Sequence, residues 1–97
     1  MEKAKDKMVR MVIEVILAVT ESEPVELLAT SNPIEELKID SGHGIPFALE
    51  MEDRLRIEIP VEINPFVVDD PMRRARTIGE IADLFLTLSS NEEADND

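Results

Sequence analysis

The sequence predicts an all-α fold, a four-helix bundle with three longer helices and one short one, and three observations lead to this expectation. Apolar residues recur at the three- and four-residue spacing of a helix in three separate segments. Proline follows both Asn32 and Asp70, as it often does at the first position of a capped helix. The chain has 97 residues and a hydrophobic content of 43%, which suits one domain with one core.

The first helix is expected over about residues 3–20, where five apolar residues share one face: Met8, Val12, Val15, Ile16 and Val19. Pro24 and the polar residues before it end this helix. A single short turn is expected next, because Asn32 can cap a helix whose first residue is Pro33. Four apolar residues near this turn are expected to point into the core: Leu27, Leu28, Ile34 and Leu37.

The second long helix is expected over about residues 44–55, with an apolar face formed by Phe47, Ala48, Met51 and Leu55. Proline fits the first turn of a helix but not its interior, so Pro46 places the helix start near Gly44. Ser41 is then expected on a flexible loop before the helix. The alternation of apolar and polar residues over 57–60 predicts an extended exit.

A long loop is expected over about residues 61–69, and its Phe66, Val67 and Val68 either cover the core, which we favour, or line a cavity. Asp70 and Pro71 predict a short third helix through residue 76. This helix carries three arginines, which are expected to pair with carboxylates of the 44–55 helix or else to select a partner: Arg73, Arg74 and Arg76.

Thr77 and Glu80 have the spacing of a capping box, which predicts a last helix to about Leu88. Four residues of this helix are expected to be buried: Ile78, Ile81, Ala82 and Phe85. The folded domain is therefore expected over residues 1–88. The acidic tail, residues 89–97, has little to bury and is expected to be disordered.

The composition excludes several classes of protein. The net charge of −12 disfavours binding to nucleic acid, which has the same sign, and favours partners with basic surfaces as much as it favours simple solubility. The absence of cysteine excludes disulfides and cysteine nucleophiles. The longest apolar run, residues 11–19, is too short to span a membrane, and no signal peptide is recognisable. We expect a cytoplasmic monomer that does not insert into membranes.

Two of the three glycines flank the single histidine in the segment Lys38 to Pro46, beside Asp40 and Ser41. Asp40, Ser41 and His43 are the residue types of a hydrolase triad, but triad members usually converge from separate segments. A metal site is equally disfavoured, because His43 has no second histidine as partner. Ser41 precedes a helix, where free N–H groups favour an anion, although a serine there is most often only a cap.

The run from Ile34 to Pro60 resembles the acyl carrier protein family. Four residues match the Leu-Gly-hydrophobic-Asp-Ser motif of that family except at its glycine: Leu37, Ile39, Asp40 and Ser41. After an ungapped interval the acidic, apolar and Ile-x-Ile-Pro exit of the family's second helix is matched as well: Glu52, Asp53, Leu55, Ile57, Ile59 and Pro60. The opening of the last helix, Thr77 to Glu80, also matches, and the resemblance extends over about residues 8–88.

The resemblance implies that Ser41 is the attachment point of 4′-phosphopantetheine, which a phosphopantetheinyl transferase transfers from coenzyme A. The thiol of this arm would carry acyl groups as thioesters, so that the chain itself would not be an enzyme. By the same resemblance, Asp40 would help to hold magnesium during the transfer.

The resemblance also implies a partner-binding surface on the second helix. Ile45 and Leu49 match exposed apolar positions that partner enzymes contact, although ordinary core positions are an equal alternative. Glu52 and Asp53 match acidic positions that face basic docking patches on acyl-loading and acyl-transferring enzymes. For these two residues, a solvated helix face is the alternative.

The segment around Ser41 departs from the family pattern at four positions. Gly42 stands where the family has leucine, Lys38 where it has glycine, and Pro46 where an acidic residue is frequent, while His43 occupies a position that is usually acidic or neutral. These departures keep a second hypothesis open, in which the domain is never modified and acts only as a helical protein-interaction module.

Overall fold

The structure, a computed structural model, describes residues 3–21, 26–60, 63–68 and 74–95. This part of the chain is mostly helical, as predicted, and its helices are α1 (Ala4–Val19), α2 (Pro33–Leu37), α3 (Gly44–Leu55) and α4 (Ile78–Asp95). A 3₁₀ turn, Ser41–His43, leads directly into α3. Two short antiparallel strands, β1 (Val67–Val68) and β2 (Arg74–Ala75), pair with each other. None of the described helices is long and apolar enough to cross a membrane.

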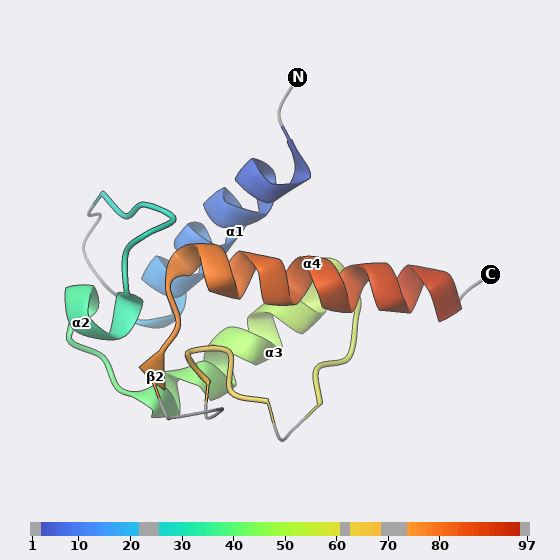
Figure 1. Cartoon of the computed structure of the whole chain (residues 1–97). Helices are drawn as coiled ribbons and strands as arrows, with labels where there is room; N and C mark the ends of the chain where they lie inside the picture. The colour runs from blue at the N-terminus through green and yellow to red at the C-terminus, as the bar shows by residue number, and fades with distance from the viewer. Residues whose placement is uncertain (1–2, 22–25, 61–62, 69–73, 96–97) are drawn as a thin grey trace.

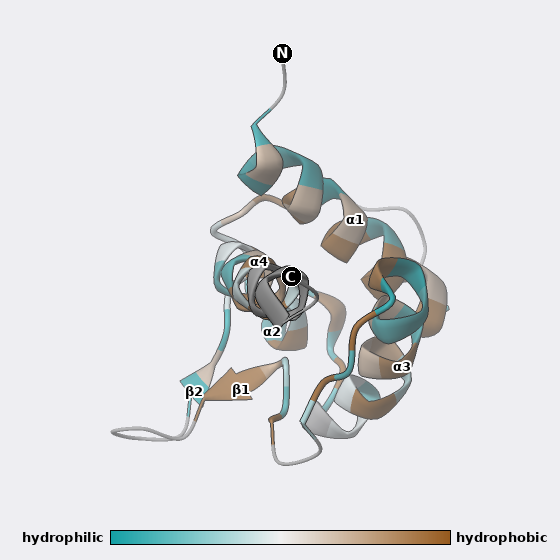
Figure 2. Ribbon diagram, turned by 90° about the vertical axis from the view of Figure 1, so that its right-hand side faces the viewer, coloured by the Kyte–Doolittle hydropathy of each residue, from teal (hydrophilic) through white to brown (hydrophobic). Residues whose placement is uncertain are grey.

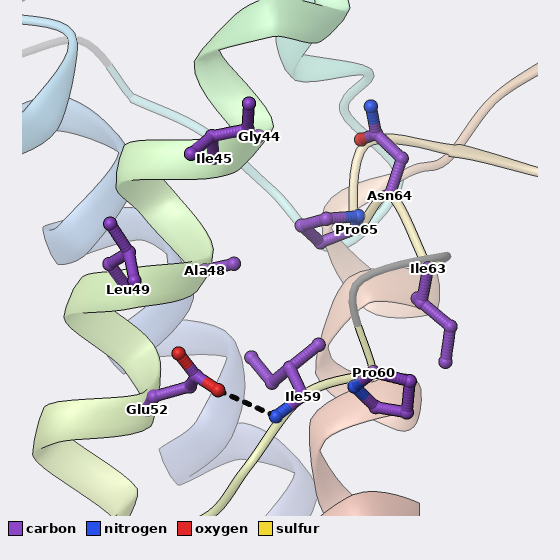
Figure 3. A pocket seen from close by; sticks show the side chains of 10 residues that line it. All are labelled: Gly44, Ile45, Ala48, Leu49, Glu52, Ile59, Pro60, Ile63, Asn64 and Pro65. Atoms are coloured by element: carbon purple, nitrogen blue, oxygen red, sulfur yellow. Dashed lines mark hydrogen bonds between the residues drawn. The ribbon is translucent and has the colours of Figure 1, made fainter.

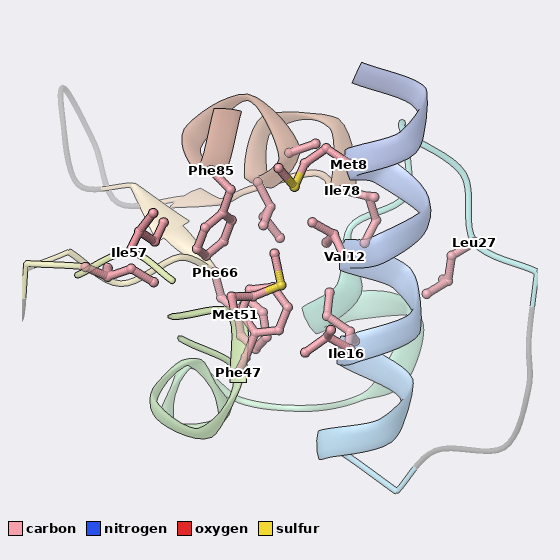
Figure 4. Packing of buried hydrophobic residues seen from close by; sticks show 14 residues of the cluster. Met8, Val12, Ile16, Leu27, Phe47, Met51, Ile57, Phe66, Ile78 and Phe85 are labelled. Atoms are coloured by element: carbon pink, nitrogen blue, oxygen red, sulfur yellow. The ribbon is translucent and has the colours of Figure 1, made fainter. Parts of the chain in front are cut away.

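The three long helices enclose one hydrophobic core. Helix α1 packs against both α4 and α3, and α4 crosses the molecule beside them (Figures 1 and 2). The centre of the core is aromatic, because the ring of Phe47 in α3 lies 5.1 Å from that of Phe66 and 5.6 Å from that of Phe85 in α4. Figure 4 shows how these rings meet Met51 and the apolar face of α1.

Helix α1 confirms the face predicted from its spacing. Met8, Val12, Val15 and Ile16 are buried, and Val19 is half-buried at the end of the helix. The side chain of Thr20 donates to the carbonyl of Ile16 at 2.7 Å and satisfies part of the last turn. The four predicted positions therefore form one wall of the core.

Helix α2 is capped as predicted. The side-chain oxygen of Asn32 accepts hydrogen bonds from the backbone N–H groups of Ile34, at 3.0 Å, and Glu35, at 3.3 Å. Leu27 is buried before this helix, but the expectation for Leu28 is wrong, since 58% of it is exposed. Leu28 lies in a turn closed by Ser31, whose backbone N–H donates to the Leu28 carbonyl and whose hydroxyl accepts from the Leu28 N–H.

Helix α3 begins at Gly44 and ends at Leu55, as predicted, with Pro46 in its first turn. Phe47 and Met51 are fully buried, so this face of the helix joins the core. After the helix the chain leaves in the predicted alternation: Ile57 and Ile59 are buried, whereas Glu58 and Pro60 are exposed. Ile57 and Ile59 thereby extend the hydrophobic core beyond the end of α3.

The predicted third helix is wrong in the part that the structure describes. Arg74 and Ala75 form strand β2, which pairs with Val68 and Val67, and the N–H of Arg76 donates to the carbonyl of Phe66 at 2.8 Å. Phe66 and Val67 are buried in the core, so their backbone offers a fixed edge for this pairing. The predicted start of that helix, at residues 70–73, lies outside the described residues.

The start of α4 is fully capped. The N–H of Thr77 donates to the Glu80 carboxylate at 3.0 Å, and the N–H of Glu80 donates to the Thr77 hydroxyl at 3.2 Å, which confirms the capping box. The two N–H groups between these residues donate to carbonyls of the loop before α2: the N–H of Ile78 donates to Ser31, and the N–H of Gly79 donates to Ala29. The free N–H groups of this helix are thus satisfied within the chain.

Helix α4 continues well beyond Leu88, to Asp95. The four residues predicted to be buried in it are all fully buried, and the helix includes the backbone of residues 89–95, in the tail for which we expected disorder. Extending a helix that has already formed costs little, so a polar segment can continue it.

Arg74 and Glu80 link β2 to α4. Two parallel hydrogen bonds join the guanidinium to the carboxylate, at 2.9 and 2.7 Å, so Arg74 pairs with α4 and not with α3 as expected. The bond from Arg74, together with that from the Thr77 backbone, lowers the pKa of Glu80 from 4.5 to about 2. A carboxyl group whose pKa is lower in the folded state adds stability above its unfolded pKa and loses it as the pH falls.

We therefore expect the free energy of unfolding to depend on Glu80 between pH 4.5 and pH 2. Glu80→Gln keeps an acceptor for the Thr77 N–H but removes the charge, so it should be less stable than the wild type at pH 6 and nearly equal to it at pH 1.5, below the folded-state pKa of Glu80. Urea unfolding at the two pH values measures this difference. Glu58→Gln, at an exposed position, should show no such change. A gap between wild type and Glu80→Gln that is as large at pH 1.5 as at pH 6 would contradict the assigned role of the ion pair.

Candidate functional site

The Asp40–Ser41 segment begins a helical turn. One carboxylate oxygen of Asp40 accepts from the N–H of Gly42 at 2.8 Å, and the Asp40 carbonyl accepts from the N–H of His43 at 3.2 Å. Asp40 is therefore the residue that caps the turn, and its side chain remains 81% exposed. The expectation of a flexible loop at Ser41 is wrong for the backbone, which is 3₁₀-helical and continuous with α3.

The glycine at position 44 is required by a close approach and not by an unusual backbone angle. A Cβ at this position would lie 2.7 Å from the side-chain oxygen of Asn64. That oxygen accepts a hydrogen bond from the N–H of Phe66 at 2.8 Å, so Asn64 is held where it is. Gly44 thus lets the start of α3 approach the segment that leads into β1.

His43 lies beside Asp40, with 3.4 Å between its Nδ1 atom and the nearer carboxylate oxygen. Its side chain is 38% exposed, directly before the first residue of α3. In the described part of the chain no three histidine, cysteine or acidic residues come together as metal ligands would. Both the side chain and the backbone N–H of His43 thus interact with Asp40, within one turn.

The outward face of α3 has two large apolar side chains. Ile45 is 70% exposed and Leu49 is 61% exposed, which settles the choice between core and surface in favour of the surface. Asp53 is exposed on the same helix, whereas Glu52 is half-buried and turned toward the chain segment that follows α3. Three of the four predicted partner-contacting residues of this helix are therefore open to solvent, Ile45, Leu49 and Asp53, and so is Asp40 before it.

Arg54 ties α3 to α1. It donates to Glu50 at 2.9 Å and to Glu14 at 3.3 Å, and these bonds, the one to Glu50 first, raise its pKa above the usual value. Arg54 interrupts the acidic run of α3 in the sequence, and the structure shows that it offsets two of the nearby carboxylates. The carboxylates of α3 that Arg54 does not pair with are those of Glu52 and Asp53.

A pocket with a volume of about 410 Å³ lies between α3 and the segment that follows it, and a cavity of this size suits a small ligand (Figure 3). One wall is the α3 surface from Gly44 to Glu52. The other wall is formed by residues before and after the undescribed positions 61–62. The lining residues are Gly44, Ile45, Ala48, Leu49, Glu52, Ile59, Pro60, Ile63, Asn64 and Pro65.

Three residues that the sequence singled out for docking, Ile45, Leu49 and Glu52, line one wall of this pocket, and none of the singled-out residues except Pro60 and Ile59 lies on the other. Phe66 and Val67, considered as cavity residues, are buried in the core as we favoured, and neither they nor Val68 line the pocket. Ile63 and Pro65 were not singled out. The sequence marks them only indirectly: Pro60 and Pro65 lie five residues apart, which disfavours a regular helix between them.

Comparisons of the chain with protein-family models, with curated proteins and with solved structures found no match.

Proposed function

We propose that this chain is an acyl carrier protein, which bears 4′-phosphopantetheine on Ser41 and passes acyl thioesters between enzymes of fatty-acid, lipid or polyketide-type synthesis. The observation that supports this most directly is the placement of Ser41. It begins a helical turn immediately before α3, a helix that exposes Ile45 and Leu49 next to an apolar pocket. A carrier needs these features together: an attachment point, a surface for partners and a place for the cargo.

Lys38 provides independent support for the resemblance. This residue occupies the position at which acyl carrier proteins have glycine, and its φ of 57° lies in the left-handed region that favours glycine. A non-glycine residue there costs roughly 1 kcal/mol. The backbone therefore has the conformation that the family's glycine would explain, although the residue differs.

The two chain neighbours of Ser41, Asp40 and Gly42, are exposed. Gly42 has no side chain, and the Asp40 side chain extends into solvent. In the transfer, the Ser41 oxygen would bond to the phosphorus next to the pantetheine of coenzyme A. Adenosine 3′,5′-bisphosphate would leave and the hydroxyl proton would be released. Asp40 would help to hold the magnesium ion that this transfer uses. The arm would supply the thiol that the chain lacks.

Partner enzymes would dock on the exposed face of α3. Ile45 and Leu49 would supply apolar contact there, and Asp53 would face a basic patch. Glu52, which binds the backbone of Ile59, would contribute mainly its charge to such docking. The same face also favours the second hypothesis, an unmodified interaction module, because two exposed apolar residues on one helix suit partner binding without any arm.

We expect a gain of one arm's mass when the purified protein is incubated with coenzyme A, magnesium and a broad-specificity phosphopantetheinyl transferase. Intact-mass spectrometry measures this gain. Ser41→Ala should show none, because its side chain has no oxygen to accept the group. Ser22→Ala should gain the arm like the wild type, since it removes another serine with acidic neighbours in the sequence. The absence of any gain with several transferases, in protein shown to be folded by circular dichroism, would leave the interaction module as the function.

A further inference from the structure

The pocket beside α3 has one ionisable group among its lining residues, Glu52. Most of the wall is apolar and is supplied by Ile45, Ala48, Leu49 and Ile59. Asn64 is the other polar residue, and it lies at the Gly44 end, close to the start of α3 (Figure 3). Glu52 lies at the opposite end. The lining of the pocket is therefore mostly apolar along its length and acidic at the end where Glu52 lies.

The carboxylate of Glu52 is held in place by a hydrogen bond to one of its two oxygens. One of its oxygens accepts from the N–H of Ile59 at 2.7 Å. Within the described ranges, the second oxygen, Oε1, has no hydrogen-bond donor. Arg54, two residues along the chain, pairs with Glu50 and Glu14 and not with Glu52. An ionised carboxylate accepts several hydrogen bonds, so Oε1 of Glu52 can accept one from a ligand.

The charge of Glu52 decides which chain end fits beside it. A carboxylate end would be repelled, both by Glu52 and by a protein with a net charge of −12. A methyl end would take water away from the carboxylate without replacing its hydrogen bonds, which is unfavourable. A protonated amine would donate to Oε1 in a charge-assisted bond, which is stronger than a neutral one.

The length of the pocket limits the ligand. Gly44 and Glu52 are eight residues apart on one helix, which corresponds to about 12 Å. A linear chain advances roughly 1.25 Å per carbon, given C–C bonds of about 1.5 Å, so on the order of eight carbons with a terminal nitrogen fit this span. The alternatives of much shorter and much longer chains would leave either the apolar wall or the acidic end unused.

We propose that this pocket binds a linear apolar chain of about eight carbons that ends in a protonated amine, with the ammonium group at Glu52 and the apolar chain along Ala48 and Leu49. As a statement about the acyl cargo, this inference rests on the proposed carrier function, in which the arm on Ser41 would enter from the Gly44 end. As a statement about the pocket, it applies to the unmodified chain.

The test uses unmodified protein and three probes of equal length, octylammonium, octanol and octanoate, each below the concentration at which it forms micelles. Amide chemical shifts of Ala48, Glu52 and Ile59 report on occupancy of the pocket in NMR titrations. Octylammonium is expected to bind about tenfold more tightly than octanol, as a charged hydrogen bond allows, and octanoate is expected not to bind. Equal binding of octanoate and octylammonium would overturn the inference on the wild type alone.

Two variants separate the carboxylate from the overall charge. Glu52→Gln keeps an acceptor for the Ile59 N–H and should lose the preference for octylammonium. Glu58→Gln changes the net charge equally at an exposed position outside the lining and should keep it. Equal losses in both variants would mean that the net charge alone attracts the cation, and would refute the site. Since no arm is present, these results do not depend on the mass measurement, and either proposal can fail while the other stands.

Discussion

Replacing Phe47 by alanine is expected to lower the free energy of unfolding by about 3–5 kcal/mol, the usual cost of removing a large buried aromatic side chain. Phe47 is fully buried, and its ring contacts both Phe66 and Phe85. The substitution would therefore leave a cavity where three parts of the chain meet: α3, the segment that leads into β1, and α4. Small domains have only about 5–15 kcal/mol of stability in total, so a substantial fraction of it would be lost. Urea unfolding followed by circular dichroism measures the change.

Leu49→Ala is the matched control for this substitution. It removes a large apolar side chain from the same helix, but Leu49 is 61% exposed, so the change should stay within about 0.5 kcal/mol. If Phe47→Ala does not fold at all, Phe47→Leu leaves a smaller cavity and keeps the effect measurable. Similar costs for Phe47→Leu and Leu49→Ala would show that the core is not centred on Phe47.

The helices that were predicted correctly are those that local signals determine. The 44–55 helix follows from the spacing of Phe47 and Met51 together with Pro46, and the start of the last helix follows from Thr77 and Glu80. These signals lie within one or two turns of each other, where helix geometry fixes their relation. Nothing distant in the chain has to be known to interpret them.

The strand at Arg74 and Ala75 was missed because its cause is distant in sequence. It forms against the backbone of Val67 and Val68, which is held in place because the neighbouring Phe66 is buried against Phe47. The Asp-Pro signal for a helix at residues 70–71 is local and contains no information about that pairing. Tertiary contacts override local propensity most easily in short segments of this kind.

The candidate site was predicted only on its α3 side. Ser41, Asp40 and the helix after them were found from the sequence, but the facing wall at Ile63 and Pro65 was not, since it is formed by chain folding back across α3. The exposure of Ile45 was predictable in principle. It precedes Phe47 by two residues, which is about 200° around a helix, so burial of Phe47 directs Ile45 outward.

Gly44→Val is expected to destabilise the domain by about 2 kcal/mol, through overpacking and the loss of a part-buried hydrogen bond. Even a Cβ at this position would lie 2.7 Å from the Asn64 side-chain oxygen, so Asn64 has to move. Its movement would leave the N–H of Phe66 without its acceptor, next to the aromatic centre of the core. Gly42→Val is the control, with a cost of at most about 1 kcal/mol, because the nearest atom belongs to the exposed Asp40 side chain, which can turn away.

A double-mutant cycle with Asn64→Ala assigns the cost of Gly44→Val to this one contact. Asn64→Ala removes the oxygen that a side chain at position 44 would strike, and by itself costs about 1 kcal/mol for the lost bond to Phe66. If the close approach explains the glycine, Gly44→Val should cost much less in the Asn64→Ala background than in the wild type, a coupling that urea unfolding of the four proteins measures. Equal costs in both backgrounds would mean that Gly44 is required by the start of α3 itself. The close approach of Gly44 and Asn64 would then have no part in holding the two walls of the pocket together.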